Sequence, residues 1–348
     1  MASSKDQPRR RPAWLPSPGI LVGALVLAGL VVLVVREQSI WHQVDSVVTH
    51  FRITRLPWLA LALGAEAASF VCYALVQRAL LADGGAELSR LDMIKLAVAA
   101  TGLTNLLPGG TAPASGWLVA QYRKRGIPMP LALWAVLAGG FAATVSVLTL
   151  TLLGAAIADL LPIWAAALCA VALAAGGVAV VAGFHQLRTL RAWTDRHHFG
   201  PFNRVLTEAG KRVGEASTFR AGSASGTRIL ALSLGNWGLD VACLITAFAV
   251  LGLPVPWRTV VFAYAVAQVA GSLAPVPGGI GFVEGGMVGA FALAGTPVGG
   301  AILATVVYRV ITTLGVAGLG SLMLLHLSRQ KRTRHARLSG KAKALTKQ

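Results

Sequence analysis

The chain has 348 residues, of which 55% are hydrophobic and 13% charged, and its mean hydropathy is +0.67. Soluble domains carry about 25% charged residues, so this composition excludes an ordinary soluble protein and predicts a protein of the lipid bilayer. The net charge is +18, yet the basic residues lie in short loops and tails between apolar runs. That distribution encodes orientation in a membrane, so we expect no nucleic-acid partner.

The N-terminal part begins with a basic segment, residues 1–17, that leads into the apolar run Pro18–Val35. This run ends at Arg36-Glu37 without a small-residue cleavage site, so it predicts a retained membrane span rather than a signal peptide. Residues 37–56 are predicted to form a short amphipathic helix at the outer interface.

Further apolar runs are long enough to cross about 30 Å of hydrocarbon as helices. They are Pro57–Ala82, Met129–Ala158, Leu161–Gly183, Thr227–Leu251 and Val298–Leu327. With the first run, the sequence predicts about six full crossings and therefore an all-α polytopic membrane protein. Residues 184–226 are predicted to be a polar cytoplasmic link, and residues 328–348 a basic cytoplasmic tail.

Two apolar segments, Ile94–Leu107 and Val260–Ala274, are too short to cross the bilayer and lead into Pro-Gly-Gly turns. Each turn is followed by another short apolar stretch, Ala112–Gln121 or Phe282–Ala294. A half-span, a break and a returning half-span predict a re-entrant helical hairpin. The turn residues are Pro108, Gly109, Gly110, Pro277, Gly278 and Gly279.

The two turns belong to an internal repeat. They lie 169 residues apart, and Gly102 falls on Gly271 at the same offset. A repeat within apolar sequence predicts a duplicated transporter fold that is symmetric in shape and asymmetric in charge, since only the second copy carries a charged residue at its turn, Glu284. We assign repeat one to residues 57–183 and repeat two to residues 227–327, within a transmembrane domain of residues 18–327.

The Lys and Arg residues predict the orientation. If the N-terminus is cytoplasmic and each hairpin returns to the side it entered, 25 of the 31 Lys and Arg residues lie in inside segments and four in outside segments. This bias predicts cytoplasmic N- and C-termini and hairpins that enter from opposite faces, which gives repeats of inverted topology. The predicted location is the cell membrane, either an inner or a plasma membrane.

Ionisable side chains inside the bilayer are costly, so each needs a partner or a water-filled cavity. Glu284 lies at the start of the second returning half-helix, where the helix N-terminus stabilises a carboxylate. Arg309 lies in the last span, and its planar fork suits carboxylate or phosphate oxygens. Two interpretations stay open: Arg309 holds a lipid phosphate with Glu284 as its resting counter-ion, or the two form a structural ion pair.

Other candidate substrate-binding residues are Asp240 and Glu66 within spans, and Ser115 and Arg123 after the first turn. Arg78 is expected to extend to the inner head groups. Polar neighbours of these candidates are Asn105, Asn236 and Gln268.

No catalytic pattern occurs in the sequence. The histidines lie in loops, at span ends or in the tail, and no HExxH, GxSxG or GxxxxGK[ST] motif is present. Cys72, Cys169 and Cys243 lie in apolar runs without CxxC spacing. We therefore expect no enzyme activity, cofactor, metal site or disulfide.

The motifs resemble a known family. The Leu106–Gly110 segment, followed by Tyr122-Arg123, resembles the first hairpin of the lysylphosphatidylglycerol synthase transmembrane-region family, the flippase-like integral membrane proteins. The PGGIGFVE segment at residues 277–284, followed by Gly295-Thr296-Pro297 and Tyr308-Arg309, follows the pattern of the second hairpin. The resemblance covers roughly residues 20–327. Unlike many relatives, this chain has no charged residue immediately after its first turn.

This resemblance implies a protein that moves phospholipids or lipid-linked intermediates between leaflets. Bifunctional relatives carry a soluble domain that aminoacylates phosphatidylglycerol, whereas this sequence ends in a basic tail, so we do not expect the synthase activity. The predicted function is therefore a translocase or scramblase of an anionic phospholipid or lipid-linked intermediate, and its predicted partners are membrane lipids. Two alternatives stay open: a transporter of a small water-soluble solute, and a non-transporting partner of a lipid- or glycan-modifying enzyme.

Overall fold

The structure is a computed structural model that describes residues 55–107, 109–182, 223–274 and 276–327. These residues are mostly helical with no strand among them, which confirms the predicted all-α class. The first expected span (residues 18–35), nearly all of the cytoplasmic link and the C-terminal tail lie outside the described residues.

Four helices in the described part of the chain are long and apolar enough to cross a membrane. They are α3 (Leu56–Asp83), α6 (Met129–Ile157), α10 (Ser223–Leu251) and the helix from Val298 to Leu327, which begins as α13 (Val298–Arg309). α7 (Ile163–Ala182) is apolar, but its segment Ile163–Gly177 is shorter than a full span by the same measure. The count of six crossings therefore stays a prediction.

The order long helix, short helix, glycine turn, short helix, long helix occurs twice along the chain. The short helices are α4 (Arg90–Leu106), α5 (Thr111–Arg123), α11 (Val260–Ser272) and α12 (Phe282–Leu293). The sequence predicted each of these helices to within a few residues. Within each pair, α4 contacts α5 and α11 contacts α12.

Local chemistry explains where α4 begins and ends. The Ser89 hydroxyl oxygen accepts a hydrogen bond from the Asp92 backbone N–H at 3.1 Å, which caps the helix N-terminus. At the other end, Leu107 is extended, as expected of a residue that precedes proline.

The two glycine turns differ in shape. Gly109 and Gly278 share positive φ angles of 57° and 60°, whereas Gly110 has a φ of −54° and its counterpart Gly279 a φ of +64°. α5 begins directly after Gly110, but α12 begins only after a further left-handed glycine, Gly281. The two turns therefore differ in local conformation, because the second has further positive-φ positions, at Gly279 and Gly281, that glycine accommodates most easily.

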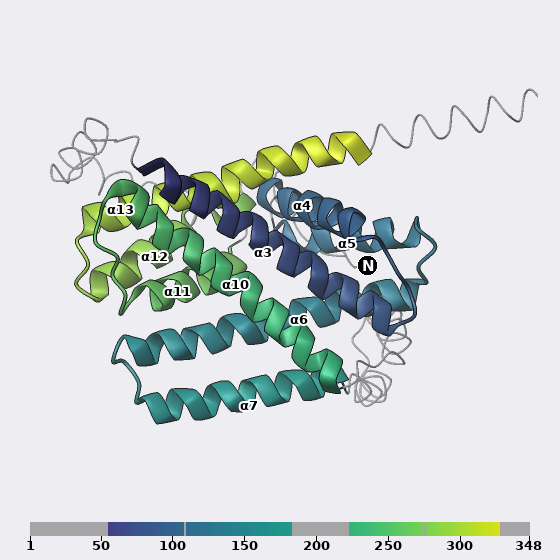
Figure 1. Ribbon diagram of the computed structural model, residues 1–348, viewed down its shortest axis with the longest axis horizontal. Coiled ribbons are helices and arrows are strands. Elements are labelled where there is room, and N and C mark those ends of the chain that lie inside the picture. Colours follow the sequence, from purple (N-terminus) through teal and green to yellow (C-terminus); the bar gives the residue numbers. More distant parts are fainter. Residues whose placement is uncertain (1–54, 108, 183–222, 275, 328–348) are drawn as a thin grey trace, which may run out of the picture.

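Two hydrophobic clusters largely follow the two repeats. The first lies among α3–α6 around Trp134 and Tyr122, and the second among α10–α13 around Phe248 and Phe291. α3 and α10 pack side by side along much of their length, and α6 pairs with α7 (Figure 1). Large apolar side chains such as Leu322 are exposed, as expected of a surface that faces lipid.

Candidate functional site

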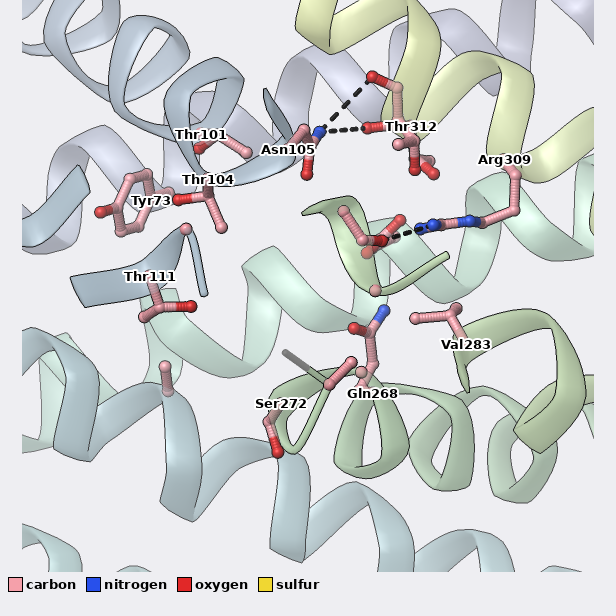
Figure 2. A pocket seen from close by; sticks show the side chains of 18 of the residues that line it. Tyr73, Thr101, Thr104, Asn105, Thr111, Gln268, Ser272, Val283, Arg309 and Thr312 are labelled. Carbon is pink, nitrogen blue, oxygen red and sulfur yellow. Dashed lines mark hydrogen bonds between the residues drawn. The ribbon is translucent and has the colours of Figure 1, made fainter. Parts of the chain in front are cut away.

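A cavity of about 610 Å³ lies between the two glycine turns. Its lining comes from α3, α4, α5, α6, α10, α11, α12 and α13, from the segment Val310–Gly315 that continues α13, and from both turns. Figure 2 shows Thr104 and Asn105 on one side of the cavity, facing Gln268 and Arg309 on the other. The lining is rich in hydroxyl and amide groups, so the cavity offers neutral hydrogen-bonding partners within a membrane protein.

Arg309 and Glu284 form an ion pair beside this cavity. Nε of Arg309 donates to Oε1 of Glu284 at 2.6 Å, and the two side chains are 15% and 21% exposed. Oε2 of Glu284 accepts from the Gly281 backbone N–H at 2.7 Å, which caps the start of α12. Both carboxylate oxygens thus accept a hydrogen bond, one from the helix N-terminus and one from the guanidinium.

Arg309 also fixes the second turn, because its Nη2 donates to the Gly278 carbonyl oxygen. The last helix continues from Arg309 into a π-helical segment, Val310–Gly315. Asn105 of α4 donates to two carbonyl oxygens of this segment, those of Thr312 and Thr313, at 3.5 and 3.4 Å (Figure 2). A π-helical turn leaves carbonyls outside the regular ladder, so it provides acceptors for a side chain from another helix.

A polar contact also joins α3 to α10 along one side of the cavity. Nδ2 of Asn236 donates to the Ser69 backbone carbonyl at 3.0 Å and to its hydroxyl at 2.6 Å. Glu66 lies one turn before Ser69 on α3, and Asp240 lies one turn after Asn236 on α10. Their carboxyl groups come within hydrogen-bonding reach of each other. Asp240 also accepts from the Tyr264 hydroxyl of α11 at 2.7 Å.

The comparisons with known proteins give the chain its family. Residues 20–320 match the family described as "Lysylphosphatidylglycerol synthase TM region". The chain belongs to this family. It is also similar to a UPF0104 membrane protein from Methanothermobacter thermautotrophicus, with 31% identity over 99 residues. That match covers 28% of this chain and 28% of the length of that relative.

Family membership agrees with the Pro-Gly-Gly motifs from which the resemblance was inferred. Together with the four apolar helices, it makes this a multi-pass membrane protein. The family comprises the membrane region associated with lysylphosphatidylglycerol synthase. Among the described residues, no group of three or more His, Cys, Asp and Glu side chains could hold a metal ion.

Most of the candidate residues predicted from the sequence line the cavity or lie beside it. The lining contains Glu66, Asp240, Ser115 and Arg309, and the turn glycines Gly109, Gly110, Gly278 and Gly279. Glu284 is not a lining residue but forms the ion pair with Arg309. Arg123 is exposed at the end of α5 and is not among the lining residues, so the structure does not bring it to this site. Pro108 lies outside the described residues.

Arg78 was expected to extend to the inner head groups. Its Nε donates to the Leu88 carbonyl oxygen at 3.1 Å, in the loop between α3 and α4, and the expectation about head groups stays a prediction. Arg78 therefore fixes a loop.

Several lining residues were not predicted from the sequence. Ser69 and Tyr73 follow Glu66 at helical spacing, and Tyr308 precedes Thr312 by one turn. Polar atoms repeated at this spacing mark one face of an apolar helix, and that signal was available in the sequence. Tyrosine gives a weaker signal than a charged residue, because its ring is also compatible with an apolar core.

Proposed function

We propose that the protein moves phosphate-bearing lipids between the two leaflets. The polar headgroup passes through the cavity while the acyl chains stay in the bilayer. The helix pairs α4–α5 and α11–α12 act as re-entrant hairpins that enter from opposite faces, so that their turns meet near the middle of the membrane. The observation that carries this proposal is the polar cavity between the two glycine turns.

The breaks in the helices support a polar passage. Backbone groups freed at membrane depth are tolerated where they are buried in protein or line a water-filled cavity. Gly109, Gly110, Gly278 and Gly279 all line this cavity. Its volume of about 610 Å³ lies within the range of about 300–1,000 Å³ that is usual for ligand pockets.

The lining supports recognition of a phosphate by neutral donors. Gln268 and the hydroxyls of Thr111 and Ser115 can replace part of the water around a headgroup, and Asn105 can do so by exchanging its long bonds to the π-helical carbonyls, at 3.5 and 3.4 Å, for bonds to the phosphate. Arg309 is the only basic residue among the described lining residues, and Glu284 neutralises most of its charge. We keep the expected preference for anionic lipids as part of the proposal, with Arg309 as its source. Because Glu284 neutralises most of the Arg309 charge, we expect this preference to be small.

Translocation can be measured in liposomes with fluorescent lipids, from the fraction that external dithionite bleaches. We expect the purified protein to accelerate the loss of the protected fraction compared with empty liposomes. Asn105→Leu keeps a similar volume but removes a polar group from the cavity, so it should slow translocation several-fold. Thr144→Val is the matched control, because Thr144 lies on α6 outside the lining and its hydroxyl bonds to its own helix. Equal rates in empty and loaded liposomes would refute the proposal.

The lipid headgroup can be varied in the same assay. Faster movement of phosphatidylglycerol than of phosphatidylcholine would support the anionic preference, and equal rates would limit the proposal to the shared phosphate. A transporter of a small solute would move neither lipid. For a non-transporting partner of a lipid- or glycan-modifying enzyme, binding of that enzyme would require residues 184–226, and neither lipid would move.

A further inference from the structure

The carboxyl groups of Glu66 and Asp240 have a hydrogen-bonding arrangement that two carboxylates cannot satisfy. The groups lie within hydrogen-bonding reach of each other, one from α3 and one from α10. Oε2 of Glu66 and Oδ1 of Asp240 are buried and make no hydrogen bond within the described part of the chain, although the Tyr308 hydroxyl also lies close enough to Asp240 to interact with it. An ionised carboxylate only accepts hydrogen bonds, so two of them can bond to each other only when one carries a proton.

Charge leads to the same conclusion. Two carboxylates in contact repel each other strongly, and one proton shared between them removes that repulsion. Arg309, which lines this cavity, is already paired with Glu284 at 2.6 Å, so it does not balance two further negative charges. The other titratable groups that face the pair from α10, α11 and α13 are neutral when protonated. They are Cys243, Tyr264 and Tyr308.

The pair adjoins the passage proposed for the headgroup. Glu66 and Asp240 both line the cavity, and so does Trp237, whose indole N–H is buried without an acceptor among the described residues. Buried polar atoms are nearly always hydrogen bonded, so unpaired atoms of both kinds here call for a bound water or a small polar ligand. A proton supplies the carboxyl groups with the hydrogen bond they lack.

We propose that Glu66 and Asp240 form a shared-proton carboxyl pair that couples movement of a headgroup in the adjacent cavity to a proton gradient. The pair takes up one proton from one side of the membrane and releases it to the other side during a transport cycle. The coupling rests on the proposed function, whereas the proton site itself does not.

Infrared difference spectroscopy of the full chain in liposomes tests the proton site directly. A protonated carboxyl has a carbonyl stretching band that a carboxylate lacks, and D₂O shifts this band. We expect the band at neutral pH in the wild type, and we expect Glu66→Gln or Asp240→Asn to remove or shift it. The matched controls, Glu87→Gln and Asp159→Asn, replace exposed carboxyl groups and should leave the band unchanged. Absence of the band in the wild type overturns the proposal even if a variant fails to fold. An unaltered band in two folded variants overturns it as well.

Lipid distribution under a proton gradient tests the coupling. One proton moved per lipid allows a gradient of one pH unit to bias the leaflet ratio by up to about tenfold. We expect such a bias in the wild type and both controls, and its loss in Glu66→Gln and Asp240→Asn. Lipid movement that ignores the gradient would overturn the coupling, as would a bias driven by a sodium gradient alone. The infrared band without any lipid movement would refute the proposed function and leave the proton site in place.

Discussion

Arg309 connects three segments of the second repeat at the scale of single residues. It lies at the end of α13, binds Glu284 on α12 and donates to the carbonyl of Gly278 in the turn. Glu284 in turn caps its own helix through the Gly281 N–H. This arrangement agrees with the interpretation of Arg309 and Glu284 as a structural ion pair. The guanidinium also lines the cavity, so the arrangement leaves it within reach of a phosphate there.

Loss of Arg309 should therefore destabilise the protein. Breaking a buried ion pair costs about 3–5 kcal/mol, and partial exposure of this pair lowers our expectation for Arg309→Gln to about 2–3 kcal/mol. Arg258→Gln provides the matched control, because Arg258 pairs with Asp159 at 3.2 Å but the two side chains are 81% and 76% exposed. The control should change stability by less than about 1 kcal/mol. Thermal unfolding in detergent measures both, and similar shifts in Tm would contradict this account.

Two neighbouring glycines of the first turn are needed for different reasons. Gly109 has a φ of 57° and an added Cβ would meet nothing within 4 Å, whereas a Cβ on Gly110 would lie 2.0 Å from the Thr104 carbonyl oxygen. Asparagine tolerates the left-handed region, so Gly109→Asn should cost less than about 1 kcal/mol. Gly110→Ala forces backbone to move, and we expect at least about 2 kcal/mol. Thermal unfolding compares the variants. A larger fall in Tm for Gly109→Asn than for Gly110→Ala would refute these separate roles of the two glycines.

Residue-level prediction from the sequence succeeded where charge demanded a partner. The cost of an ionised group in the bilayer made a Glu284–Arg309 contact a natural expectation, and the two side chains do pair. The Glu66–Asp240 contact could not be predicted in this way. Helical spacing gives the face of each helix but not which helix packs against it, and α3 and α10 are far apart along the chain.

At the scale of elements, the short helix α4 packs against the last helix through glycines. A Cβ added to Gly320 would lie 2.6 Å from the Gly102 Cα atom, and one added to Gly102 would lie 2.7 Å from the Gly320 Cα atom. Small residues allow membrane helices to approach this closely. The contact therefore holds the first hairpin against the helix that carries Arg309.

Gly320→Ala should separate these helices and lower stability by about 1–3 kcal/mol, the usual cost of overpacking. Gly318→Ala is the matched control in the same helix, because a Cβ there meets nothing within 4 Å. That change should be neutral or slightly stabilising, since alanine favours a helix more than glycine does. Equal unfolding temperatures for the two variants would show that the close approach is unimportant.

Element bounds followed closely from the sequence because apolar length, proline and glycine determine where membrane helices begin and end. The expected run Met129–Ala158 forms α6 (Met129–Ile157), for example. The shape of the second turn was not predictable from the repeat. The repeat offset of 169 places the equivalent of Thr111 at Ile280, but α12 begins at Phe282 after Gly281. Glu284 explains this difference, because it caps the helix from a position that is uncharged in the first copy.

At the scale of the whole molecule, the predicted inverted topology puts Arg123 in the cytoplasm and Arg258 outside. In a background without Cys72, Cys169 and Cys243, we expect an impermeant maleimide to label Arg258→Cys in intact cells. Arg123→Cys should react only after the membrane is opened, because the positive-inside bias places its loop in the cytoplasm. Labelling of both positions from the same side would refute the inverted topology.

The cavity is a property of the whole molecule that the sequence indicated only in part. Broken helices predicted a polar site near the two turns. The contributions of Ser69, Tyr73 and Asn236 depend on how α3 packs against α10, and that packing brings together residues from both repeats. Tertiary packing of this kind leaves no local pattern in the chain.

The central claim, that lipid headgroups pass through this cavity, can be tested by blocking it. In the same cysteine-free background, a bulky maleimide is attached to Ser115→Cys in the cavity lining or to Glu87→Cys in an exposed loop. After complete modification, verified by mass spectrometry, dithionite-accessible lipid movement is measured in liposomes. The account predicts that modification at position 115 abolishes the acceleration and that modification at position 87 preserves it. Undiminished lipid movement with position 115 fully modified would contradict the account.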